Sequence, residues 1–202
     1  PILNFAAGPF GDSAIAAMSI VSRFMMFINS ALIGFGQGFQ PVCGFNFGAK
    51  RYDRVLEAFW FCVKVAITML TCFGIIALVI SRPIITAFRR EDLEVIRIGT
   101  LALRLQILTL PLQAWVIMVN MLTQSIGYGF RASLVAMGRQ GLFLIPSLLI
   151  LPNICGILGV QLAQPVADVF TFALATFIVV RVLEELKTMR EGQKMSEKAG
   201  RP

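Results

Sequence analysis

AFWFCVKVAITMLTCFGIIALVI, residues 58–80, is the stretch of sequence that decides the fold. Its single charged residue is Lys64. A helix needs about 20 mostly apolar residues to cross the roughly 30 Å hydrocarbon core of a bilayer. Because lipid offers the backbone no hydrogen-bond partners, such a stretch should be helical, with its backbone bonds made internally. Residues 58–80 therefore predict a membrane-spanning helix.

Four further stretches meet the same length requirement. They cover about Ser13–Phe39, Ile96–Ile126, Ala132–Leu151 and Val160–Val182. Asp12-Ser13 is an N-cap signal for the first of them, and the stretch from Ile96 is longer than one crossing requires, so we expect it to be tilted or to extend outside the bilayer. We predict an all-α, polytopic transmembrane helix bundle of about five complete spans. A charged tail follows over residues 184–202.

The composition agrees with a membrane protein. Of 202 residues, 57% are hydrophobic and 14% charged, whereas soluble domains carry about 25% charged residues. The net charge of +7 would suggest a nucleic-acid partner in a soluble protein. Here the basic residues mostly lie between or beyond the apolar stretches and no aromatic-basic patch is present, so we expect a lipid bilayer and no nucleic acid.

The sequence lacks the residue patterns that are typical of catalytic and metal-binding sites. The chain has no histidine, which excludes Ser-His and Cys-His arrangements within it. Its four cysteines lack CxxC spacing, which argues against a zinc site. We expect no catalytic residues, no metal site and no organic cofactor, and we predict that the chain is not an enzyme.

Lysine and arginine counts predict the orientation. Eleven of these residues fall on the side of the Lys50 loop, the Arg131 loop and the C-terminus, against four on the other side. Because basic residues favour the cytoplasmic side, we expect a multi-pass protein of the inner (plasma) membrane with a cytoplasmic C-terminus. Arg139 is counted here with the cytoplasmic residues.

Polar residues repeat at helical spacing in three of the stretches. One row contains Gln106, Gln113, Asn120 and Gln124; a second contains Ser22-Arg23, Asn29-Ser30 and Gly36-Gln37; a third contains Gln161, Gln164, Asp168 and Thr171. Each row lies on one face of its helix. Three such faces favour a shared hydrated cavity, although polar contacts between packed helices, worth roughly 0.6 kcal/mol each, are the alternative.

These faces supply the candidate site residues. Substrate-cleft candidates are Arg23, Met26, Asn29, Gln37, Gln113, Ile117, Asn120, Met121 and Gln124. Asp168 is the ion-coupling candidate, and Arg23 and Asp168, the two charged residues predicted to lie well inside spans, are candidates to pair. Hinge or kink candidates are Gly36, Gly38, Pro41, Pro111 and Pro146. Such residues loosen the helical hydrogen-bond ladder, and static close packing by small residues is the alternative.

Several motifs resemble one family. Residues 34–49, GFGQGFQPVCGFNFGA, resemble the second-half signature of the multidrug and toxic compound extrusion (MATE) transporters. Ser133 to Gln140, followed by Ile145-Pro146, resembles that family's "S-L-x-R-Q … I-P" pattern, here with Ala136-Met137-Gly138 as additional spacing before Arg139-Gln140. Residues 156–160 and 164–168 are similar to the entrance of its last helix. Together these motifs span most of the chain in the family's order.

The resemblance implies a fold and a function. The family fold is twelve helices in two six-helix lobes around a central cleft. Residues 1–183 would be the C-terminal lobe, with the end of its truncated first helix at Pro1–Ala7, and a missing N-terminal lobe of the same chain as its partner. The resemblance implies a secondary active antiporter that exports diverse, cationic amphipathic drugs by alternating access, driven by a sodium or proton gradient.

One departure from the family concerns the coupling carboxylate. Many members place it in the first lobe or in the seventh or tenth helix, but Ile96–Ile126 contains no Asp or Glu. The acid is then in the missing lobe, which we favour, or is Asp168. Two other functions stay open: a flippase for lipid-linked precursors, for which Arg23 is the one strong basic candidate, and a non-transporting membrane scaffold, which would bury Gln113, Asn120 and Gln124 for stability.

Overall fold

A computed structural model describes residues 6–90 and 92–199. Within this part of the chain every regular element is a helix. The elements are η1 (Gly8–Phe10), α2 (Asp12–Gly48), α3 (Tyr52–Val79), α4 (Ser81–Phe88), α5 (Leu93–Leu108), α6 (Leu110–Ser125), α7 (Gly129–Met137), η2 (Gly138–Leu142), α8 (Leu144–Cys155) and α9 (Ile157–Ala199). Most of the predicted helix end at Pro1–Ala7 lies outside the described residues.

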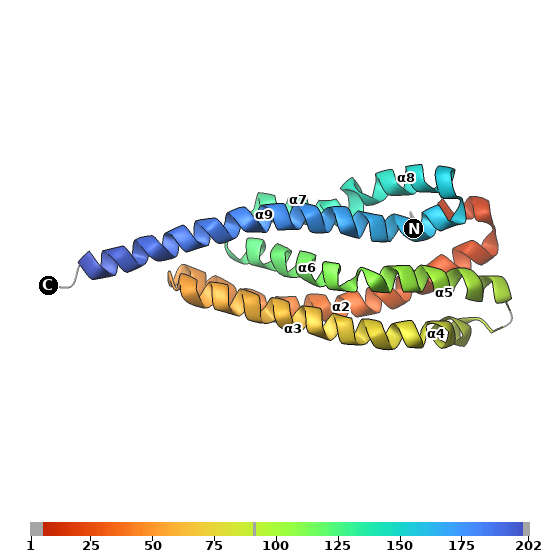
Figure 1. Ribbon diagram of the computed structural model, residues 1–202, viewed down its shortest axis with the longest axis horizontal. Coiled ribbons are helices and arrows are strands. Elements are labelled where there is room, and N and C mark those ends of the chain that lie inside the picture. The colour runs from red at the N-terminus through yellow and green to blue at the C-terminus, as the bar shows by residue number, and fades with distance from the viewer. Residues whose placement is uncertain (1–5, 91, 200–202) are drawn as a thin grey trace.

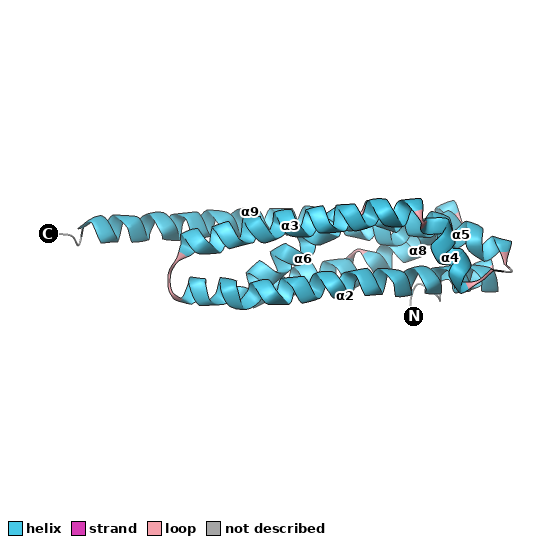
Figure 2. Ribbon diagram, turned by 90° about the horizontal axis from the view of Figure 1, so that it is seen from below, coloured by secondary structure: helices cyan, strands magenta, loops and turns pink. Residues whose placement is uncertain are grey.

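The helices form an elongated bundle with their axes roughly along its length (Figure 1). Helix α6 lies inside it, because it packs against α2, α3, α7 and α9. Helix α8 packs against α9, and α4 packs against α5. Seen from below, α2 runs along one side of the bundle and α3 and α9 along the other (Figure 2). The core between them is apolar, with Met18, Phe59 and Met118 fully buried.

Four segments are long and apolar enough to cross a membrane: Asp12–Gly48, Tyr52–Val79, Gly129–Cys155 and Ile157–Met195. The bent pair α5 and α6 makes a fifth if it is counted as one span. The prediction of an all-α bundle with about five spans is therefore confirmed.

The ends of the first two spans differ from the prediction. The first helix continues through Pro41 to Gly48 without a break, and its N-cap is Gly11 rather than the Asp12-Ser13 pair. The Ser13 hydroxyl instead donates a hydrogen bond of 3.0 Å to the carboxylate of Asp92. Asp92 is the N-cap of α5 and accepts from the backbone N–H of Val95, which holds the pKa of Asp92 below its ordinary value.

The predicted single helix from Ile96 to Ile126 is two helices. Helices α5 and α6 meet at Thr109 with a bend of 50°. Pro111 lies in the first turn of α6, where its missing N–H costs no hydrogen bond, but its ring would clash with the preceding turn of a continuous helix. The stretch from Ile96 is therefore longer than one straight span because it is bent in the middle.

The fourth span also contains an irregular turn. Residues Gly138–Leu142 form a π-helix, and the N–H of Phe143 donates to the carbonyl oxygen of Gly138 at 3.1 Å. Pro146 follows in the first turn of α8, and Pro152, which was predicted to lie beyond the span, is inside that helix. Because π turns insert an extra residue, the turn rotates the side chains that follow it.

The charged segment after residue 184 continues as part of α9. Asp53 of α3 pairs with Arg190 and Lys194 of this segment at N–O distances of 3.4 Å. Figure 1 shows α9 extending past the other helices toward the C-terminus.

The glycine hinge candidates of α2 have different surroundings. A Cβ atom at Gly36 would lie 3.0 Å from Cγ of Met121, whereas one at Gly38 would meet nothing within 4 Å. Gly36 therefore permits the close approach of α2 and α6, which is the packing alternative named for this position.

Candidate functional site: a buried ion pair beside a cavity

The carboxylate of Asp168 lies at the centre of a polar network inside the bundle. The side chain is 2% exposed. Its Oδ2 accepts hydrogen bonds from Nε2 of Gln113 at 2.7 Å and from Oγ1 of Thr109 at 3.0 Å. Its Oδ1 lies 3.4 Å from Nε of Arg139 and 3.4 Å from Nε2 of Gln164. Both carboxylate oxygens are therefore fully engaged.

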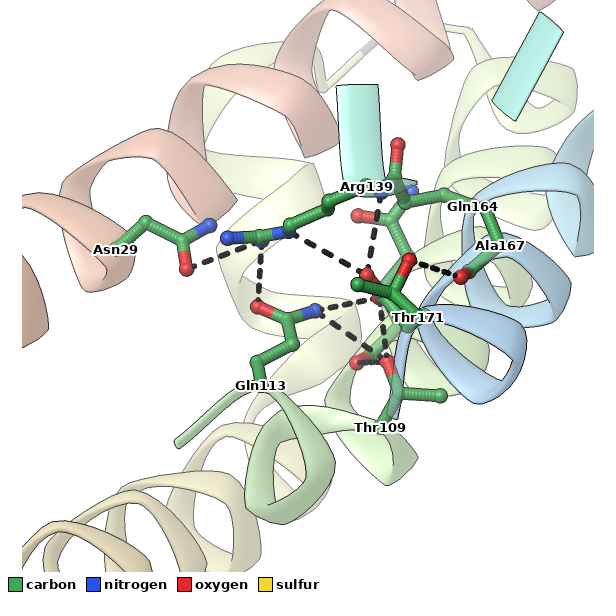
Figure 3. A network of polar contacts seen from close by, with 9 residues as sticks. Asn29, Thr109, Gln113, Arg139, Gln164, Ala167 and Thr171 are labelled. Atoms are coloured by element: carbon green, nitrogen blue, oxygen red, sulfur yellow. Dashed lines mark hydrogen bonds and ion pairs between the residues drawn. The ribbon is translucent and has the colours of Figure 1, made fainter. Parts of the chain in front are cut away.

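Arg139 is the counter-ion of Asp168, a role that its sequence pattern does not indicate. Arg23 is the candidate partner that the sequence suggests, and Arg139 is counted there among the cytoplasmic residues. The structure places Arg139 in the π turn within the fourth span, with its side chain 18% exposed. Its guanidinium also donates to Oδ1 of Asn29 at 3.2 Å and to Oε1 of Gln113 at 2.8 Å, so it joins α2, α6 and α9 (Figure 3).

Gln113 connects the two charges. Its amide oxygen accepts from Arg139 and its amide nitrogen donates to Asp168, an arrangement that fixes the orientation of the amide. Thr109 lies at the bend between α5 and α6, and its hydroxyl contacts both Asp168 and the carbonyl oxygen of Gln106. The bend therefore brings a hydroxyl and an amide to the same carboxylate.

A cavity of about 800 Å³ opens beside this network. It is lined by Ser19, Ser22, Arg23, Met25, Met26, Asn29, Ser30, Ile33, Gln106, Gln113, Arg139, Gln140, Leu144 and Gln164. Four of the predicted cleft residues are among them: Arg23, Met26, Asn29 and Gln113. The wall combines guanidinium, amide and hydroxyl groups with apolar side chains, and Met26 is 71% exposed.

The other predicted cleft residues lie farther along α2 and α6. Ile117 and Met121 are buried, whereas Gln37 and Gln124 are exposed. Oδ1 of Asn120 accepts from Gln124 at 2.5 Å, and the amide of Asn120 donates to the carbonyl oxygen of Ala132. Gln124 also accepts from Gln40 of α2 at 2.9 Å. This second group connects helices and does not line the cavity.

A second ion pair joins the fourth span to α9 nearer the C-terminal end. Arg131 donates two hydrogen bonds to Glu185, at 2.8 and 3.1 Å, and both side chains are 36% exposed. The guanidinium of Arg131 lies 4.6 Å from the ring centroid of Tyr128. A hydrogen bond from the phenol to Glu185 raises the pKa of Tyr128 above its ordinary value.

No group of three His, Cys, Asp or Glu side chains within residues 6–90 and 92–199 could hold a metal ion. The charged side chains on the cavity wall are Arg23 and Arg139, and Asp168 pairs with Arg139 beside it. This set can hold a charged organic group or exchange ion-pair partners.

Comparisons with known proteins identify relatives of this chain. The MatE family model matches residues 2–150. The multidrug export protein MepA of Staphylococcus haemolyticus is 25% identical over 185 residues, which cover 92% of this chain and 40% of MepA. MepA of Staphylococcus saprophyticus is 22% identical over 197 residues, covering 95% of this chain and 42% of the relative. The chain thus spans about two fifths of the length of these relatives.

Solved structures show the same fold. The Vibrio cholerae MATE transporter VcmN in its bent form matches 91% of this chain and 42% of its own chain, with a TM-score of 0.82 and 19% identity. A MOP superfamily transporter from Pyrococcus furiosus matches 92% of this chain and 42% of its own, with a TM-score of 0.84 and 17% identity. With the family model covering most of its length, the chain belongs to the MatE family of multi-pass membrane transporters.

Proposed function

We propose that this chain forms one wall of the cleft of a secondary active exporter, which moves amphipathic organic compounds out of the cell by alternating access. The observation that carries the proposal is the cavity of about 800 Å³ beside a buried ion pair in a bundle of membrane-length helices. Binding sites for small organic molecules are typically 300–1,000 Å³, mostly apolar, with a few placed polar groups.

The apolar part of the wall suits varied compounds. Met25, Met26, Ile33 and Leu144 contribute apolar surface to the cavity. Methionine side chains are flexible and polarisable, and they adapt to ligands of different shape. We expect drugs that carry a cationic group, in line with the multidrug export names of the MepA relatives.

We propose that sodium or protons drive export, with the coupling carboxylate outside the region that this chain covers. Asp168 is the alternative, but Arg139 already balances its charge and three further side chains donate to it. A coupling ion at Asp168 would have to displace Arg139, because the two cations would compete for one carboxylate.

The two other functions make different demands on the site. A flippase for lipid-linked precursors would need several unmatched basic residues for a pyrophosphate, and of the two cavity arginines Arg139 is paired with Asp168. A scaffold would use Gln113 for stability alone, which fits its burial and its contacts. We keep the exporter because a scaffold has no use for an open cavity whose wall combines polar and apolar side chains.

The test is transport by the complete protein in vesicles. Efflux of a fluorescent cationic dye is measured under a sodium gradient and, separately, under a proton gradient. We expect transport under one of the two gradients, and none from vesicles that contain residues 1–202 alone, because a single wall does not enclose a cleft. Dye movement that needs no gradient, or no movement under either, would contradict the proposal.

We further propose that the protein lies in the plasma membrane with its C-terminus in the cytoplasm. The support is the excess of lysine and arginine on that side of the bundle. With Arg139 inside a span, the count becomes ten against four, so the preference for that orientation is retained.

A further inference from the structure

Arg23 is the one charge on the cavity wall without a partner in the part of the chain that the structure describes. It lies on α2 and lines the cavity. The ion pairs and cation–π contacts of the described residues involve other arginines and lysines. Arg139, the other cavity arginine, is matched by Asp168. The wall therefore carries one unmatched positive charge.

Apart from Arg139, the polar groups on the cavity wall beside Arg23 are uncharged amides and hydroxyls. The wall contains no Asp or Glu side chain. Asn29 lines the cavity and uses its Oδ1 to accept from Arg139, which leaves its Nδ2 available as a donor. Ser22 adds a hydroxyl on the same helix. An arginine inside a membrane span is costly unless a partner meets it, so this arrangement favours an anionic partner.

We propose that this part of the cavity is a subsite for a monoanionic oxygen group, a carboxylate or a sulfonate, carried by the transported compound. Arg23 would supply the counter-charge, and Asn29 and Ser22 would supply neighbouring donors. The planar guanidinium matches such groups through two parallel hydrogen bonds. The inference rests on the proposed function, and it adds to the cationic substrates expected there a class of compounds that bear an acid group as well as a cationic one.

The number of charges selects the class of ligand. A single unmatched guanidinium balances one negative charge, whereas a pyrophosphate would leave a surplus of negative charge in a low-dielectric site. The competing explanation is that a carboxylate elsewhere in the complete protein neutralises Arg23. That explanation predicts the same effect of Arg23 on every substrate, so it can be distinguished by experiment.

The experiment compares two probes with the complete transporter in vesicles. The first is a fluorescent amphiphile with a quaternary ammonium and a carboxylate, and the second is its methyl ester, which keeps the cation and loses the acid. Initial transport rates are measured for the parent protein, Arg23→Gln, Arg23→Lys and the control Arg97→Gln. Arg97 is an exposed residue of α5 outside the cavity, so its substitution makes the same charge change elsewhere.

We expect Arg23→Gln to slow transport of the acid at least about tenfold, the loss that follows when a charged hydrogen-bond partner is removed. The ester should be transported by Arg23→Gln nearly as fast as by the parent, which also shows that this variant is folded. Arg23→Lys should retain part of the acid transport, and Arg97→Gln should retain all of it.

Three results would overturn the inference while leaving the exporter intact. In the first, Arg23→Gln slows transport of the acid and of the ester equally. In the second, the ratio of the two transport rates is the same in Arg23→Gln as in the parent. In the third, the parent protein transports the ester but not the acid. Failure of the parent to transport either probe under both gradients would instead reject the proposed function, and the inference with it.

Discussion

Two arginines of the fourth span each meet an acid of α9, and the two pairs differ in burial. Arg131 and Glu185 form a bidentate salt bridge with N–O distances of 2.8 and 3.1 Å, and both side chains are 36% exposed. Arg139 and Asp168 meet at 3.4 Å, but the acid is 2% exposed and is surrounded by amide and hydroxyl donors. The outer pair has the shorter and better aligned contacts, but removing one member of the inner pair should destabilise the fold more.

The reason is the surrounding medium. An exposed pair competes with water and contributes about 0–1 kcal/mol. A buried pair that loses one member leaves an uncompensated charge, which costs about 3–5 kcal/mol. The N–O distances alone would therefore give the wrong order for the contributions of the two pairs to stability.

The largest effect should come from breaking the inner pair on one side. Arg139→Gln leaves Asp168 charged and buried, so we expect the free energy of unfolding of the complete protein to fall by about 3–5 kcal/mol. Asp168→Asn should cost less, because Arg139 lies on the cavity wall with part of its side chain exposed. Chemical unfolding in detergent, followed by circular dichroism, measures both. The double variant should be more stable than Arg139→Gln; equal stability would show that the two charges are not coupled.

A smaller effect should come from removing the amide between the charges. Gln113→Leu deprives Asp168 of a donor and Arg139 of an acceptor, so we expect a loss of about 1–3 kcal/mol in the free energy of unfolding. Gln140→Leu is the matched control, because Gln140 lines the same cavity with an exposed side chain and should change stability by less than about 0.5 kcal/mol. If the two variants behave alike, Gln113 is not a bridge.

The smallest effect should come from the outer pair. Arg131→Gln should lower the free energy of unfolding by about 0–1 kcal/mol. This difference should shrink as salt is added, because ions screen exposed charges, while the cost of Arg139→Gln should hardly depend on salt. Repeating the unfolding series at low and high ionic strength tests the contrast. A salt-independent loss at Arg131 would mean that the outer pair is buried in the complete protein.

The sequence was sufficient to predict the spans but not their internal breaks. Apolar length identifies residues 58–80 as a span because lipid permits little else. Pro111 and Pro146 indicated irregular helix geometry, and a bend of 50° lies beside Pro111. The π turn at Gly138–Leu142 has no comparable signal in a single sequence, since it depends on which carbonyl oxygen accepts from Phe143.

The partners within the site were the harder part. Asp168 and Gln113 stood out because polar residues are costly inside spans. The same argument applied to Arg139, which lies inside the predicted stretch Ala132–Leu151, but its charge was counted with the loops. The choice between Arg23 and Arg139 as the partner of Asp168 depends on how helices pack side by side, and periodicity within each helix carries no information about that.

The continuous helix α9 has a practical consequence. At 1.5 Å per residue its 43 residues measure roughly 65 Å, about twice the hydrocarbon thickness of a bilayer. Because α9 is continuous, the part of it beyond the membrane should move together with the part that carries Asp168. A small tilt of α9 during the proposed transport cycle would therefore displace its C-terminal end by a larger distance. A spectroscopic label on the exposed side chain of Met195 would measure that displacement.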